Sequence, residues 1–94
     1  MTLDEFKISL AEATPPTGLS QLLQALWEDA KGNWDKAHKI AQSVADSNGA
    51  WVHAYLHRKE GDLSNALYWY SCAGRTKPNQ SLREEWEEIV FALL

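Results

Sequence analysis

The chain has little cysteine, little proline and no excess of basic residues. Its 94 residues include one cysteine, Cys72, so no disulfide can form within the chain. The three prolines fall at only two places, 15–16 and 78, which leaves long stretches free to form helices. Lysine and arginine number 9 against 13 aspartate and glutamate, a formal net charge of -4. This balance argues against a nucleic-acid partner, which normally meets a basic surface.

Long apolar runs are also absent. No uninterrupted apolar segment approaches the ~20 residues that a membrane-spanning helix needs, so no membrane partner is expected. The first residues, Met1 to Glu5, have neither a basic leader nor a long apolar stretch, and we therefore expect a cytoplasmic protein. What is present is 45% hydrophobic residues, including five tryptophans. That content is enough for one core and predicts a single domain over 1–94.

Apolar residues recur at helical spacing in six segments. We predict helices over 3–13, 19–30, 34–46, 50–60, 63–74 and 82–94, with a break at 47–49. Gly32 and Gly61 are expected to end helices in the left-handed conformation, and Asn33 to cap the helix after it. Ser81 with Glu84 matches the capping box. No segment alternates with period two, so the predicted fold class is all-α.

The chain also contains a faint internal repeat, because segment 24–37 reappears in altered form as 53–66. Each copy reads as a helix, a glycine, a polar cap and a second helix. The repeat predicts two helical hairpins, at 19–47 and 50–78, with flanking helices at 1–13 and 81–94. One hairpin cannot bury its apolar face alone, so stacked hairpins indicate an interaction scaffold rather than an enzyme. We expect no catalytic residues and no cofactor.

The second copy carries the residues of a known signature, at the spacing of that family: Ala54, Gly61, Asp62, Ala66, Tyr70, Ala73 and Pro78. The chain thus resembles the tetratricopeptide repeat proteins. Segment 66–74 resembles the second helix of Sel1-like repeats, and 53–62 resembles a string shared by a group of small uncharacterised bacterial proteins. The resemblance implies a right-handed stack of antiparallel hairpins that binds a protein or peptide on its concave surface. The repeat is shorter than the family's, since Gly32 and Gly61 are 29 residues apart rather than about 34.

In the tetratricopeptide register, the concave positions of the second copy are Asn48, Trp51, Tyr55, Arg58 and Lys59. We predict an aromatic groove built from Trp51 and Tyr55, to which Trp69 contributes. Arg58 and Lys59 are predicted to orient an acidic partner at its rim. The predicted function is non-catalytic binding of a protein or peptide. A second partner is another copy of the chain, because Phe91 and Leu94 lie off the apolar stripe of the last helix.

The alternative interpretation is a small metal-binding protein or a metal-dependent enzyme, centred on His53 and His57. His53 and His57 are four residues apart, which places both imidazoles on one face of a helix where they can bind a zinc-type ion. His38 or Glu60 can complete such a site. In the other interpretation, the histidines pack and hydrogen-bond where two helices meet.

Three further features of the sequence carry expectations about burial. Cys72 is expected to be a small buried hydrophobe. The glutamates of 84–88 are expected to form a solvated face, with Trp86 turned inward. In the string 68–70, successive side chains point about 100° apart, so at least one of them must face a second helix or a partner.

Overall fold

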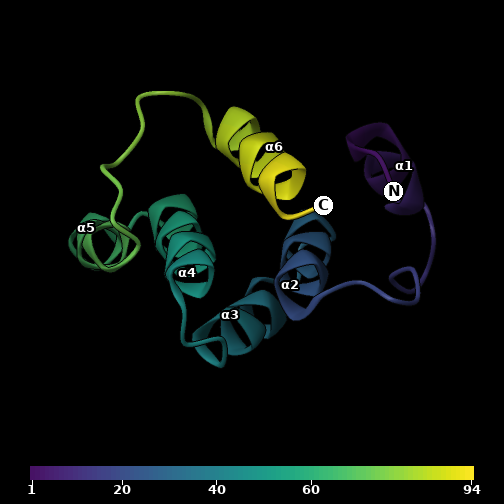
Figure 1. Ribbon diagram of the computed structural model, residues 1–94, viewed down its shortest axis with the longest axis horizontal. Helices are drawn as coiled ribbons and strands as arrows, with labels where there is room; N and C mark the ends of the chain where they lie inside the picture. Colours follow the sequence, from purple (N-terminus) through teal and green to yellow (C-terminus); the bar gives the residue numbers. More distant parts are fainter.

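The computed structural model describes all 94 residues and contains six α-helices and no strand (Figure 1). They are α1 (Leu3–Ser9), α2 (Gln21–Ala30), α3 (Trp34–Gln42), α4 (Ser47–Glu60), α5 (Leu63–Cys72) and α6 (Leu82–Leu93). The predicted all-α class is confirmed. The longest helix, α4, has 14 residues, and no helix of the chain has the length and apolar character to cross a membrane.

Side chains that cap the first turns set where the helices begin. Thr2 with Glu5 and Ser81 with Glu84 form capping boxes, in which hydroxyl and carboxylate each bond a free backbone amide. Asp62 caps α5 through the amide of Asn65. Asn33 occupies the N-cap position of α3 as predicted, but its side chain makes no capping bond and donates instead to Glu28 Oε1 at 2.8 Å.

The predicted break at 47–49 is also wrong, because these residues are the first turn of α4. The Asp46 carboxylate accepts a hydrogen bond from the Gly49 amide at 2.7 Å, so the helix begins at Ser47. Helices α1, α3 and α5 end earlier than predicted, at Ser9, Gln42 and Cys72. Apolar spacing continues past these ends, but past Ser9 and Gln42 the backbone amides bond carbonyls three residues back, as Leu10 does to Lys7 at 3.2 Å and Ser43 to Ile40 at 3.1 Å, which is a tighter turn than the α-helix.

Gly49 is required for a close approach of two backbones. A Cβ at this position would lie 1.9 Å from the carbonyl oxygen of Val44. We expect Gly49→Ala to lower the free energy of unfolding by about 1–3 kcal/mol, because the backbone must shift to relieve the clash. Urea denaturation measures this, with Ser47→Ala in the same turn as the control, expected to change stability by less than about 0.5 kcal/mol. Equal stabilities of the two variants would contradict the prediction.

The helices from α2 to α5 pack in chain order, each against the next. Two tight turns join α2 to α3 and α4 to α5, and in them Gly32 and Gly61 have φ of +89° and +88°. The predicted left-handed glycines are therefore confirmed. Each of these short connections joins two helices that pack against one another.

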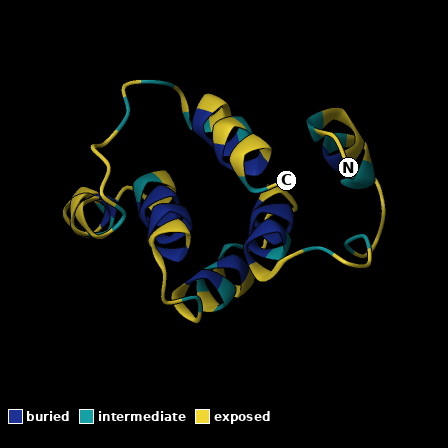
Figure 2. Cartoon of the chain, in the orientation of Figure 1, coloured by how far each residue is buried: buried dark blue, intermediate teal, exposed yellow.

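The last helix returns to the start of the chain and packs across α2 and α4 (Figure 1). Trp86 donates a hydrogen bond from Nε1 to the Leu26 carbonyl at 3.1 Å, and Ile89 and Val90 are fully buried. All six helices contribute to one hydrophobic core, which lies on their inward faces (Figure 2). Helix α6 is therefore part of the core and not only a flanking element.

Candidate functional site

The exposed aromatic groove predicted on α4 is not formed. Trp51 and Tyr55 are 3% and 2% exposed, because α6 covers the face of α4 that carries them. Arg58 is half-buried and forms an ion pair with the carboxylate of Glu85, a residue of α6. Trp69 stacks on His53 with ring centroids 4.0 Å apart. Of the five predicted partner-binding residues, Lys59 alone is exposed.

Glu85 of α6 is the centre of a buried polar cluster. Its carboxylate is 1% exposed and accepts hydrogen bonds from Tyr70 Oη at 2.7 Å, Arg58 Nη1 at 2.9 Å and Trp51 Nε1 at 3.3 Å. Burial and the adjacent carboxylate raise the pKa of the Tyr70 phenol, so the phenol stays protonated and donates a hydrogen bond to Glu85. The predicted solvated face of glutamates is wrong at this position. Glu85 instead links α6 to α4 and α5 by hydrogen bonds.

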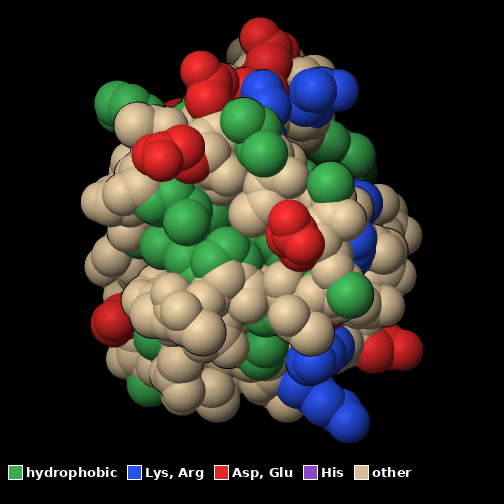
Figure 3. Space-filling view, turned by 90° about the vertical axis from the view of Figure 1, so that its right-hand side faces the viewer, with side chains coloured by type: hydrophobic (Ala, Val, Ile, Leu, Met, Phe, Trp, Pro, Cys, Tyr) green, Lys and Arg blue, Asp and Glu red, His purple; other side chains and the backbone are tan.

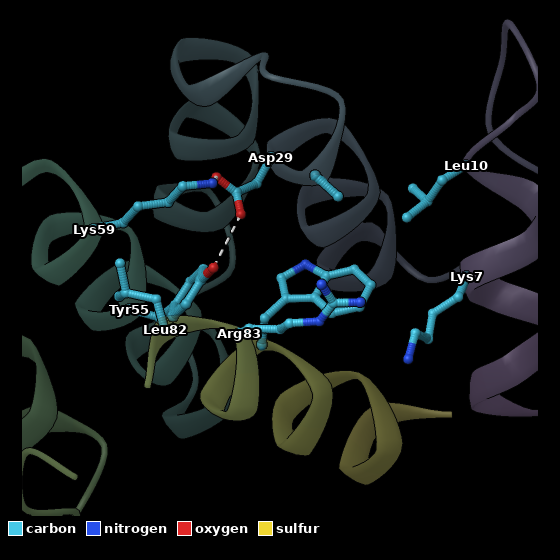
Figure 4. Close-up of a pocket in the computed structure, with 9 residues that line it drawn as sticks. Lys7, Leu10, Asp29, Tyr55, Lys59, Leu82 and Arg83 are labelled. Carbon is cyan, nitrogen blue, oxygen red and sulfur yellow. Dashed lines mark hydrogen bonds and ion pairs between the residues drawn. The ribbon is translucent and has the colours of Figure 1, made fainter. Parts of the chain in front are cut away.

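A cleft of about 490 Å³ opens where α1, α2, α4 and α6 meet (Figure 4). Nine residues line it: Lys7, Leu10, Asp29, Ala30, Tyr55, Lys59, Leu82, Arg83 and Trp86. Two of them, Tyr55 and Lys59, belong to the predicted partner-binding set. The sequence reasoning missed Lys7, Leu10 and Arg83, because it could not place the two end helices beside each other.

Helix α1 forms one wall of this cleft and is held there by specific contacts. Phe6 is fully buried and packs against Trp86, with ring centroids 5.8 Å apart. The Trp27 indole donates a hydrogen bond to Ser9 Oγ at 3.2 Å, and Lys31 Nζ donates to the Leu10 carbonyl at 2.7 Å. The wall therefore has a defined position although α1 is only seven residues long.

The charges around the cleft do not balance. Lys7 Nζ and Arg83 Nε share one carboxylate, that of Glu87, at 3.2 and 3.4 Å. Lys59 Nζ lies 3.0 Å from Asp29 Oδ1. Three cations thus face two carboxylates, which leaves one positive charge in excess at the rim of an acidic protein. The side chains of these two pairs are partly open to solvent, 33% for Lys7, 30% for Glu87 and 80% for Arg83, so water weakens the pairs and they can exchange partners.

The Asp29 carboxylate is held inside the cleft and is only 2% exposed. Besides the ammonium of Lys59, it accepts a hydrogen bond from Tyr55 Oη at 3.3 Å (Figure 4). Burial and the Asp29 charge raise the pKa of the Tyr55 phenol, which therefore stays a donor. Asp29 is thus fully engaged, and the exchangeable cations are those on α1 and α6.

Other apolar side chains remain on the surface. Leu63, Leu67 and Tyr68 of α5 are more than half exposed, and Phe91 of α6 is 74% exposed. Viewed from the side of α1, hydrophobic side chains form a patch with charged side chains around it (Figure 3). Self-association through Phe91 stays a prediction.

The aromatic string 68–70 divides as expected, since Tyr70 is buried, Trp69 packs on His53 and Tyr68 faces solvent. Cys72 is exposed, so its predicted burial is wrong.

The three histidines lie together at the contact of α3 and α4, and none of them lines the cleft. His38 Nε2 is 2.9 Å from His53 Nε2, and Glu60 bonds His57. The tertiary structure therefore joins all the residues that the alternative metal site requires.

Fold and cleft together define a small all-α protein with an amphipathic cleft. The chain matches no protein-family model, no curated protein and no solved structure.

Proposed function

We propose that this protein is a non-catalytic binding module that takes an acidic, apolar peptide segment of a partner protein into the cleft of Figure 4. The observation that carries the proposal is the combination of an apolar floor with a rim that has one positive charge in excess. The resemblance of the two hairpins to tetratricopeptide repeats, which bind peptides, supports the same class of function.

The floor and the rim have different roles in this proposal. Leu10, Leu82 and Trp86 offer apolar surface on which a leucine or phenylalanine of the peptide can pack, and such buried contacts supply most binding energy. Lys7 and Arg83 attract a carboxylate of the peptide, which replaces part of their interaction with Glu87. Charged rim contacts contribute mainly specificity and association rate.

Fluorescence anisotropy with labelled peptides tests this function. We use short peptides in which glutamate alternates with leucine or phenylalanine, and matched peptides with lysine in place of glutamate. We expect binding of the acidic set only, and about tenfold weaker binding to the double variant Lys7→Glu/Arg83→Glu at low salt. Raising the salt concentration should reduce the affinity of the native chain more than that of the variant.

Two further variants locate the binding. Ala30→Trp places a large side chain in the cleft from an exposed position and should block the peptide while the helical content stays unchanged. Lys39→Glu makes a charge reversal on α3, outside the cleft, and should leave affinity nearly unchanged. Equal binding of acidic and basic peptides, no binding of either, or full binding by Ala30→Trp would each refute the proposed function.

A further inference from the structure

The only three histidines of the chain lie in one cluster, at the contact between α3 and α4. His53 and His57 lie one turn apart on α4, and His38 faces them from α3. One ring nitrogen from each lies within 4.8 Å of those of the other two. The closest pair, Nε2 of His38 and Nε2 of His53, is 2.9 Å apart.

Neighbouring side chains fix the orientation of all three rings. The His38 ring stacks on Trp34 at a centroid distance of 4.9 Å, and the His53 ring stacks on Trp69 at 4.0 Å. His57 Nδ1 lies 2.7 Å from Glu60 Oε1. In the neutral tautomer whose Nδ1–H donates a hydrogen bond to that carboxylate, Nε2 keeps a free lone pair. A carboxylate behind a histidine is the usual outer partner of a metal-binding imidazole.

Burial at the contact of α3 and α4 also favours neutral imidazoles at His38 and His53, and the neutral ring is the form that metal ions bind. His53 and His57 are 5% and 8% exposed. Burial and the two neighbouring imidazoles lower the pKa of His53 to about 4, and burial lowers that of His38.

We propose that His38, His53 and His57 bind one divalent transition-metal ion of the zinc type. Zinc takes imidazole nitrogens at about 2.0–2.1 Å, so two ligands of a tetrahedral ion lie about 3.3 Å apart, which the His38 and His53 nitrogens reach by a small opening. Three protein ligands leave a fourth position for water or another donor. Glu60 is a positioning residue that holds the His57 ring. This site is independent of the peptide cleft, which shares none of these residues.

Titration of untagged, chelator-treated protein with Zn²⁺ in a calorimeter tests the proposal. We expect one ion per chain, a rise in melting temperature with zinc concentration, and the visible absorption of four-coordinate cobalt when Co²⁺ is used instead. His38→Gln, at a half-buried position, should weaken Zn²⁺ binding at least 100-fold without unfolding the protein. Circular dichroism of the metal-free variant checks that its helices remain.

The matched carboxylate variants test the role of Glu60. Glu60→Gln should weaken Zn²⁺ binding about 10- to 100-fold with the stoichiometry unchanged, whereas Glu88→Gln, on the exposed face of α6, should have no effect. If His38→Gln binds Zn²⁺ as tightly as the native chain, or if Cys72→Ser abolishes binding, the site is not this cluster. Absence of saturable binding would show that the histidines only pack together.

Discussion

Replacing Glu85 by alanine lowers the free energy of unfolding by about 3–5 kcal/mol, the largest effect we expect from a single polar residue. The carboxylate accepts from three side chains of two other helices, and all of its own surface is buried. Its removal leaves the Arg58 guanidinium half-buried without its carboxylate partner, and leaves the phenol of Tyr70 without an acceptor. Arg58 keeps its hydrogen bond to the Gln80 carbonyl but loses its counter-charge, and the Tyr70 phenol then has an uncompensated desolvation cost.

Urea denaturation monitored by circular dichroism measures this effect. Glu88→Ala is the matched control, since Glu88 lies on the same helix with its side chain exposed, and it should change stability by less than about 0.5 kcal/mol. Glu85→Gln should retain part of the stability, because the amide still accepts a hydrogen bond but carries no charge for Arg58. If Glu85→Ala and Glu88→Ala unfold at the same urea concentration, the buried cluster does not hold α6 in place.

The second large effect concerns acid. The pKa of His53 is about 4 in the folded chain against an ordinary value of 6.5, because burial and the nearby His38 and His57 oppose its charge. Between these two pKa values the unfolded chain binds more protons at His53 than the folded chain does. The contribution of a neutral His53 to stability is therefore fully present above about pH 6.5 and is lost as the pH falls toward 4. We expect His53 to account for a loss of about 2 kcal/mol between pH 7.5 and pH 5.

Urea midpoints measured in the presence of a chelator, from pH 7.5 down to pH 5, test this dependence. His53→Gln removes the titrating ring, so the variant should lose less stability over this range than the native chain. The comparison also cancels the contribution of carboxylates elsewhere, while Glu60 and Asp35, whose charges act on His38, remain in both proteins. An identical pH profile of the two proteins would contradict the pKa that we assign to His53.

Local features of the fold could be predicted because neighbouring residues determine them. Helical spacing identified all six helices, the left-handed glycines at 32 and 61 follow from their position after apolar helices, and the capping box at Ser81 needs only Glu84. The errors also have local causes. The stop signal at 47–49 was wrong because the Asp46 side chain caps a helix that begins there.

The burial of Glu85 was missed, although its position carried a signal. Glu85 follows Leu82 by three residues and precedes Ile89 by four, so it lies on the apolar stripe of α6. The acidic neighbours at 84, 87 and 88 hid this pattern. A glutamate on an apolar stripe is a reason to look for a buried cationic or hydroxyl partner.

The sequence by itself determined the all-α class, the tight turns and the pairing of His53 with His57 on one helix face, because these depend on spacing within one segment. Only the tertiary structure decided that α6 covers Trp51 and Tyr55, that α1 and Arg83 complete the cleft, and that His38 joins the other two histidines. The physical reason is that an amphipathic pattern shows which face of a helix must be buried, but the hydrophobic effect has no direction. Which helix covers that face depends on packing and on buried partners such as Arg58 and Glu85.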